Sequence, residues 1–463
     1  MPRRLVVCAD GTWNTQEGRG VAEPPPTNVV KLARAVRPVA ADGSTQIVYY
    51  HEGVGNGSPL LRFLGGVAGY GLSRNIRDCY RFLVDNYMPG DQLYFFGFSR
   101  GAYTVRSLVG MIRNSGLLKG EHAHLIGKAY DLYRGRSTSS HPNSVDSKAF
   151  REAYSHDVEI ECLGVWDSVG ALGLPTFGPL GRRLARKYAF HDVRLSGHVR
   201  HAYHALAIDE QRKPFLPAIW EVDTPGQDVE QVWFAGVHSN VGGGYPDCGL
   251  SDVALQWMLD KAAALGLEFD ERYVQLAVTC AADGEIYDSM SLGYKLMHPL
   301  MRPAFKGGRR VINEPRPPRN GKSVRTCERV HESVHERIRR VTSPPRGPYA
   351  PPNLPPNLLT PPAMRSADLL AGLRGATSAA TRPGATPPAP AATAAAPVPA
   401  APTPAAPTTS AIAAPPPVAA APPPARPVEP PPRPERASPY PTMPRPDLPV
   451  ELPAPGAPSA PAG

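Results

Sequence analysis

The chain of 463 residues has no run of apolar residues that approaches the ~18 needed for a membrane-spanning helix. Its N-terminus, MPRRLVVCADGTWN, has only five apolar residues before Asp10, whereas the apolar core of a secretory leader is roughly 7–15 residues long. We therefore expect no cleaved signal peptide. Without a leader or a span, the expected location is the cytoplasm.

Motifs for metals, disulfides and nucleotides are also missing. The six cysteines are scattered and include no Cys-x-x-Cys pair, which argues against zinc and disulfides and for a reducing compartment. The glycine-rich loops 53–57 and 65–71 lack the spacing of a dinucleotide-binding or Walker loop. We expect no metal and no other cofactor.

The net charge of +9 has its richest basic stretch at 302–346. One interpretation of this stretch is contact with phosphates, of lipid head groups or of nucleic acid. The alternative is a solvated basic surface, which is favoured because Phe305 is the one aromatic residue among its basic residues. We therefore expect no nucleic-acid partner.

Proline is abundant but unevenly placed. Of the 57 prolines, 38 follow Arg340, whereas all five tryptophans and all six cysteines precede it. A tail rich in Pro and Ala cannot bury enough apolar surface to offset its chain entropy. We predict one folded domain over 1–340, with its core at 3–260 and a helical or irregular addition at 265–340. The tail over 341–463 is predicted to be disordered, either as a linker or as a segment that binds partners reading polyproline.

Through the first 260 residues, short apolar runs alternate with helical patterns. This alternation predicts an α/β fold in which helices flank a mostly parallel sheet. The expected strands are 5–9, 47–50, 92–96, 158–166 and 230–237. The expected helices are 72–87, 101–114, 128–134, 194–206 and 251–264.

A candidate nucleophile lies between the strand at 92–96 and the helix at 101–114. Residues 97–101, GFSRG, match Gly-x-Ser-x-Gly. In this context Ser99 would sit on a sharp strand-to-helix turn, where the flanking glycines permit close backbone approach. The Arg100 backbone N–H, at the helix N-terminus, would stabilise an oxyanion. The alternative is a serine that only caps the helix.

A nucleophilic serine needs a histidine to accept its proton and a carboxylate to orient that histidine. In α/β-hydrolases the chain order is serine, acid, histidine. His238 fits this order because it follows the strand at 230–237 and enters a glycine-rich loop; the alternative is a buried structural histidine. Asp167 is the preferred acid because it follows the strand at 158–166, at the end where α/β sites gather. Asp209 is the rival acid. His201 and His204 lie on the helical pattern at 194–206 and are expected to pack there.

The loop after the first strand is expected to complete the site. Gly11 or Thr12 would offer a second backbone N–H to the oxyanion. Asp10 would hydrogen-bond this loop or, less favourably, bind a metal together with Asp167 and His238.

Several motifs occur together in one order: CADGTWN at 8–14, GYGLSRNI at 69–76, GFSRGAY at 97–103, VWDSVG at 165–170 and GVHSNVGGGY at 236–245. This set resembles the α/β-hydrolase catalytic domain of type VI secretion lipase effectors and their uncharacterised bacterial relatives, over residues 3–260. The resemblance implies a serine esterase acting on phospholipids, with Ser99 as nucleophile, His238 as base and Asp167 as acid. Asn240 is a departure, because the family often has Asp after His-Ser.

The leading hypothesis is a serine hydrolase of carboxylic esters, with phospholipid acyl esters as the implied substrate and a transient membrane surface as its setting. The resemblance also implies export by a dedicated secretion system, with a secretion-machinery or immunity partner. One alternative is a non-catalytic binding or delivery module whose Pro-rich tail recruits partners. A weaker one is a metal-dependent phosphoesterase that uses Asp10, Asp167 and His238. If the tail is a linker, truncation after Arg340 should leave hydrolysis intact.

Overall fold

The computed structural model describes residues 2–11, 25–53, 66–135, 137–169, 195–212, 215–222, 224–289, 309–314, 316, 324–340 and 348–359. The chain divides into two units, Met1–Ala380 and Thr381–Gly463, and every described residue belongs to the first. The predicted disordered tail therefore falls outside the described residues, except for 348–359.

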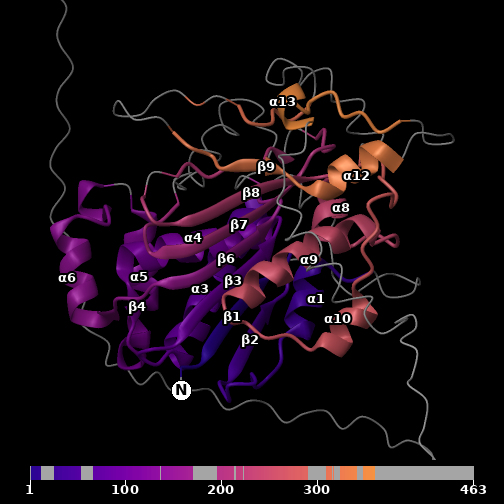
Figure 1. The fold of residues 1–463 in the computed structure, drawn as a ribbon. Coiled ribbons are helices and arrows are strands. Elements are labelled where there is room, and N and C mark those ends of the chain that lie inside the picture. Colours follow the sequence, from indigo (N-terminus) through magenta and orange to yellow (C-terminus); the bar gives the residue numbers. More distant parts are fainter. Residues whose placement is uncertain are drawn as a thin grey trace, which may run out of the picture. The chain divides into compact units, whose positions relative to one another are not determined.

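A single seven-stranded sheet organises the described part of the chain (Figure 1), in the order β2-β1-β3-β6-β7-β8-β9. Every neighbouring pair in it is parallel, which confirms the predicted α/β class. The strands are β1 (Arg4–Ala9), β2 (Gln46–His51), β3 (Gln92–Phe98), β6 (Ile160–Trp166), β7 (Val199–Ala207), β8 (Asp228–Phe234) and β9 (Glu328–Val330). A separate antiparallel pair is formed by β4 (Leu117–Leu118) and β5 (Ser155–His156).

Helices cover both faces of this sheet (Figure 1). The α-helices are α1 (Asn28–Ala35), α3 (Gly66–Asn86), α4 (Arg100–Ser115), α5 (Ile126–Arg134), α6 (Val145–Tyr154), α8 (His238–Gly242), α9 (Gly249–Ala264), α10 (Glu271–Ala277), α12 (Glu332–Arg340) and α13 (Pro356–Leu359). Two short 3₁₀ helices are η1 (Gly120–Leu125) and η2 (Thr138–Ser140). Among the described helices, none is long and apolar enough to cross a bilayer.

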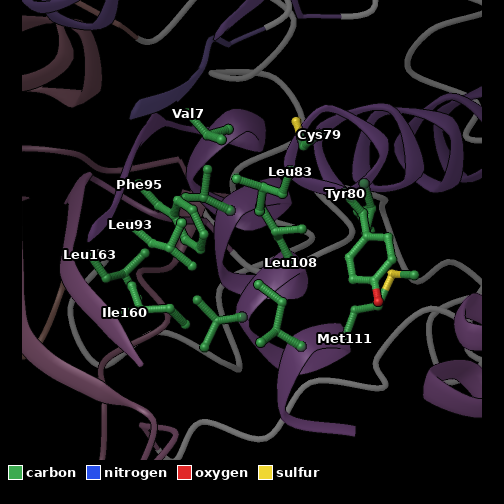
Figure 2. Packing of buried hydrophobic residues seen from close by; sticks show 14 of the residues in the cluster. Val7, Cys79, Tyr80, Leu83, Leu93, Phe95, Leu108, Met111, Ile160 and Leu163 are labelled. Carbon is green, nitrogen blue, oxygen red and sulfur yellow. The ribbon is translucent and has the colours of Figure 1, made fainter. Parts of the chain in front are cut away.

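Alternating side chains along β1 show how both faces are buried. Leu5 and Val7 pack into a core with α3 and α4, whereas Val6 and Cys8 pack into a second core with α1 and α9. Figure 2 shows the first of these cores, where Leu83 and Leu108 from the helices meet Leu93 and Phe95 from β3. Because successive strand residues face opposite sides, a strand covered on both sides reads as one continuous apolar run.

The predicted helix at 194–206 is wrong, because the structure has strand β7 there. β7 lies between β6 and β8, and its last six residues are all buried. Those residues, AYHALA, are rich in alanine and leucine, which favour helices locally. Pairing with two neighbouring strands overrides that propensity. His201 and His204 therefore lie on a central strand rather than on a helix.

The strand order creates a topological switch point at one edge of the sheet. β1 lies between β2 and β3, so the chain changes direction across the sheet at the carboxyl ends of β1 and β3. Ligands of open α/β sheets bind at such a switch point. Since all seven strands are parallel, the residues that follow β1, β3, β6 and β8 gather along this same edge.

Residues 348–359 lie beyond the domain boundary predicted at 340, and yet they pack on the folded unit. Leu354 is buried in a third apolar core with Trp233, Ile312 and Val334. The Pro-rich composition did not indicate this packing, because only a few residues of the segment make the contacts. The ordered part of the chain thus extends past 340.

Candidate active site

Ser99 sits on a sharp turn between β3 and α4. Its backbone angles are φ 57° and ψ −117°, a conformation in which an L-residue is strained. The flanking glycines make the turn possible: a Cβ on Gly97 would lie 2.6 Å from the Gly101 carbonyl carbon, and one on Gly101 would lie 1.9 Å from the Ala9 oxygen. The Ser99 side chain makes no capping hydrogen bond to α4, which argues against the helix-cap alternative.

The serine, the histidine and the preferred acid come together in the structure. His238 is the first residue of α8, a few residues after the end of β8, and its Nε2 lies 2.8 Å from Ser99 Oγ. Its Nδ1 lies 2.6 Å from Asp167 Oδ2. All three side chains are buried. With the proton on Nδ1, the imidazole donates to Asp167 and accepts from the Ser99 hydroxyl, the arrangement that a general base requires.

The surroundings of His238 keep its imidazole oriented and neutral. The ring centroids of Phe98 and Phe215 lie 4.6 Å and 4.8 Å from the centroid of the imidazole. The backbone N–H of His238 donates to Glu210 Oε2 at 3.2 Å. Burial lowers the pKa of His238, while its hydrogen bond to Asp167 opposes that shift without overcoming it. The histidine is therefore in its basic form at neutral pH.

Asp167 is fixed at the end of β6 by contacts on both carboxylate oxygens. The residue adopts a positive φ of 42°, and its Oδ1 accepts the Ala207 backbone N–H at 3.1 Å. Burial alone would raise the pKa of this carboxyl, but the positive charge of Arg310 and the hydrogen bonds from His238 and Arg310 hold it well below its ordinary value. Asp167 thus stays ionised although it is fully buried.

Arg310 is the site residue that the sequence analysis missed. Its side chain is 1% exposed, and its Nη1 and Nη2 lie 2.5 Å and 2.9 Å from the two oxygens of Asp167. It belongs to the basic stretch at 302–346, which was predicted to be a solvated surface or a phosphate contact. Nothing local distinguishes it from the other arginines there, because its partner lies 143 positions away.

The rival acid, Asp209, has other partners. Its Oδ2 accepts the Gly236 backbone N–H at 2.7 Å and the Tyr349 hydroxyl at 2.8 Å. Burial raises the pKa of this carboxyl. The structure thus places Asp167 against the imidazole, and it places Asp209 as a support for the turn that leads to His238.

Asn240 braces the start of α8. Its Oδ1 accepts the Val237 backbone N–H at 3.2 Å, and its Nδ2 donates to the Glu285 carbonyl at 2.8 Å. Both ends of the amide are therefore engaged with backbone, so its observed role is to shape the loop and not to assist the imidazole.

Asp10 holds the loop after β1. Its Oδ1 accepts the Gly11 N–H at 2.6 Å, and its Oδ2 accepts the hydroxyls of Thr27 and Tyr50 at 2.7 Å and 2.8 Å. The Gly11 N–H therefore points to Asp10, which is a correction to its expected role as an oxyanion donor. Gly11 instead allows the backbone of this loop to lie close to Ser99, because a Cβ at position 11 would lie 3.3 Å from Ser99 Cβ.

The other expected oxyanion donors are placed differently. Arg100 is the first residue of α4 and directly follows Ser99 in the turn. Its position directly after Ser99 suits the oxyanion. Thr12 lies outside the described residues.

The described residues contain no group of three or more His, Cys, Asp or Glu side chains that could hold a metal. Both ring nitrogens of His238 already face Ser99 and Asp167, and the carboxylate of Asp10 faces Gly11, Thr27 and Tyr50. The metal-ligand set Asp10, Asp167 and His238 is therefore not assembled in this structure.

A parallel sheet with a glycine-flanked serine after β3, an aspartate after β6 and a histidine after β8 defines the class of α/β-hydrolase folds. The family model described as the catalytic domain of Tle1-like phospholipase effectors of the type VI secretion system matches residues 3–261, more than half of the chain. The chain belongs to this family.

Individual relatives are more distant. The chain is 30% identical to an uncharacterised protein of Saccharomyces cerevisiae, YEL023C, in an alignment over 234 residues that covers 46% of this chain and 32% of the relative. An uncharacterised protein from Pseudomonas aeruginosa aligns at 17% identity with a TM-score of 0.37, over 61% of this chain and 49% of the other.

The Tle1 effector, in its structure bound to the VgrG spike of the type 6 secretion system, aligns at 20% identity with a TM-score of 0.32. That alignment covers 54% of this chain and 52% of the effector. The chain thus spans about a third of the yeast relative and about half of each solved chain.

Proposed function

We propose that this chain is a serine hydrolase that cleaves carboxylic esters. The observation that carries the proposal is the buried relay from Ser99 Oγ to His238 Nε2 at 2.8 Å and from His238 Nδ1 to Asp167 at 2.6 Å. A neutral imidazole that bonds both groups can take the serine proton as the hydroxyl attacks, and an ionised aspartate stabilises the imidazolium that forms.

In the first half of the reaction, Ser99 Oγ bonds to the ester carbonyl carbon and its proton passes to His238 Nε2. The carbonyl oxygen becomes an oxyanion, which the backbone N–H groups of Arg100 and Thr12 would stabilise. The tetrahedral intermediate then expels the alcohol oxygen, which receives the proton from His238. The product of this half is an acyl ester on Ser99.

In the second half, water attacks the acyl carbon and gives a proton to His238. Collapse of this intermediate returns the proton to Ser99 Oγ and releases the carboxylic acid. The positive end of α4 adds to the stabilisation of both oxyanions, since the helix begins at Arg100 beside the reacting carbon.

We propose phospholipid acyl esters as the substrate class, met transiently at a membrane surface. Support comes from membership in the family of Tle1-like phospholipase effectors. The same membership supports export by a type VI secretion system, with a spike protein as partner and an immunity protein as inhibitor. Co-purification of the full chain with a VgrG spike tests the partner; no binding at micromolar concentrations would count against it.

Substitution of Ser99 by Ala tests the activity. Hydrolysis of a short-chain ester and of phospholipid vesicles should fall by roughly 10⁴-fold or more, because no other group supplies the nucleophile. A fluorophosphonate probe should label the wild-type chain and not Ser99→Ala. The matched control is Ser107→Ala, since Ser107 lies on α4, the helix that follows Ser99, with its hydroxyl bonded to the Tyr103 carbonyl.

Other outcomes identify the alternatives. A folded wild-type chain that neither labels nor hydrolyses would support the non-catalytic binding or delivery module with an interacting Pro-rich tail. Hydrolysis that survives Ser99→Ala but is abolished by a chelator would support the metal-dependent phosphoesterase. Cleavage of short-chain esters but of no phospholipid would overturn the substrate class alone.

A further inference from the structure

A fully buried guanidinium bonds both oxygens of the Asp167 carboxylate, including the oxygen that faces His238. Arg310 bonds both oxygens of the carboxylate as a two-pronged clamp, and it also donates to the backbone carbonyls of Ala207 and Phe215. Arg310 therefore joins the ends of β6 and β7 to the loop that carries Phe215. The planar fork of arginine suits such a bidentate contact, and lysine cannot reproduce it.

We propose that Arg310 is a positioning residue of the active site, which holds Asp167 in its productive orientation and offsets part of its charge towards His238. The inference rests on the proposed serine-hydrolase function. The general mechanism needs an acid that orients the imidazole, but it does not need a cation on that acid. Arg310 thus adds a second hold on the Asp167 carboxylate and a positive charge beside it, which Ser99 and His238 do not supply.

The orienting effect follows from the carboxylate's surroundings. Asp167 Oδ1 receives the Ala207 N–H and Arg310 Nη1, and Oδ2 receives His238 Nδ1 and Arg310 Nη2. Each oxygen thus has two donors, which prevents rotation of the carboxylate. Removal of the guanidinium would leave one donor on each oxygen and a buried charge without its counter-ion.

The charge effect follows from the distances. A carboxylate that is bonded to a guanidinium stabilises an imidazolium less than an isolated carboxylate does. Arg310 should therefore help to keep His238 neutral at acidic pH. Among the residues that the structure describes, the charged or titratable groups around His238, besides Asp167, include the hydroxyl of Ser99 and the bonded pair Arg212 and Glu210.

Two further titratable or charged groups contact the neighbouring residue, Ser168. His204 on β7 is buried and accepts the Ser168 backbone N–H at 3.1 Å, and burial lowers its pKa to about 3, so it carries no charge at neutral pH. Arg106 on α4 bonds the Ser168 hydroxyl at 3.3 Å. The charge of Arg310 also contributes to the low pKa of His204, which at about 3 lies below the pH range of the acid limb.

Contacts from the C-terminal side hold Arg310 itself. The Asn353 side chain donates to the Arg310 carbonyl at 3.1 Å and to the Ile208 carbonyl at 3.0 Å. Ile312, two residues further on, is buried in the third core with Leu354. The clamp therefore comes from a part of the chain that lies beyond the family match at 3–261.

Two substitutions of Arg310 separate its orienting effect from its charge effect. For each variant of the full chain, the pH dependence is measured for Ser99 labelling by fluorophosphonate and for kcat/KM on a short-chain ester. Arg310→Lys keeps the charge but loses the fork, so the plateau rate should fall by about 10- to 100-fold with the acid limb unmoved. Arg310→Met loses both, so the plateau should fall and the acid limb should move up by about one pH unit.

Arg151→Met is the control, because Arg151 on α6 also donates to two backbone carbonyls, those of Asn114 and Pro142. It should leave the plateau and the limb unchanged. If the acid limb of the Arg310→Met pH profile coincides with that of the wild type, the charge effect is overturned. If that variant does not fold, an undiminished plateau in Arg310→Lys overturns the positioning role. A wild-type chain that neither labels nor hydrolyses would instead refute the proposed function.

Discussion

At His238, two acidic side chains are comparable in sequence but differ in three dimensions. Asp167 bonds the imidazole, whereas Asp209 bonds the Gly236 N–H and the Tyr349 hydroxyl. Both follow strands of the sheet, so their positions in the chain do not decide between them. The direction of each side chain does, and that direction depends on neighbours from distant segments.

Replacement by asparagine should therefore cause a large loss of activity at Asp167 and little loss at Asp209. Asp167→Asn should lower kcat by about 10⁴-fold, because an amide neither selects the required imidazole tautomer nor stabilises the imidazolium. Asp209→Asn keeps an oxygen acceptor for the Gly236 N–H and should stay within a few-fold of wild type. The measurement is kcat on a short-chain ester, normalised to the folded fraction. Loss in Asp209→Asn with activity retained in Asp167→Asn would reverse the assignment.

At the scale of elements, the segment 348–359 links the C-terminal side of the chain to the active-site edge of the sheet. Tyr349 bonds Asp209, Asn353 bonds the carbonyls of Ile208 and Arg310, and Leu354 is buried in the third core. The expectation that truncation after Arg340 leaves hydrolysis intact was based on composition. These contacts argue against it.

Two truncations test the segment. A chain that ends at Arg340 loses all of these contacts, and the burial of Leu354 alone contributes roughly 1.5–3 kcal/mol to the free energy of unfolding. We expect a lower melting temperature and slower Ser99 labelling. A chain that ends at Leu359 retains the segment and should match the full-length protein in both. Equal labelling rates for the two truncated chains would show that the segment is dispensable.

At the scale of the whole molecule, several histidines are buried in neutral form. Burial lowers the pKa of His204 to about 3, and burial next to His335 lowers that of His331 to about 4. In the unfolded chain both would titrate near 6.5. Between about pH 4 and 6.5 the unfolded state therefore binds protons that the folded state does not, so stability falls as the pH falls through this window.

The free energy of unfolding should accordingly be about 2–3 kcal/mol lower at pH 5.5 than at pH 7, from these two histidines. Urea denaturation at the two pH values measures it. His331→Phe, which preserves stacking on Phe234, should remove about half of the difference. The lowered pKa of Asp167 does not add to this loss, because its contribution disappears only below the ordinary carboxyl pKa of 3.8. Equal stability at both pH values would contradict the prediction.

The sequence by itself determined the α/β class, the serine and the histidine, and it reduced the acid to Asp167 or Asp209, because the signals for these are local. An apolar strand, a turn that only glycines can flank, and a polar residue close after a strand each occupy a few consecutive positions, as at Ser99, Asp167 and His238. Only the tertiary structure decided that 199–207 is a strand, that Asp209 supports a turn, that the Gly11 N–H faces Asp10, and that Arg310 and segment 348–359 reach the site. The physical reason is the separation in sequence between the residues that interact. A partner 143 positions away leaves no pattern near Arg310, and strand pairing on both sides of β7 overrides the helical preference of its own residues.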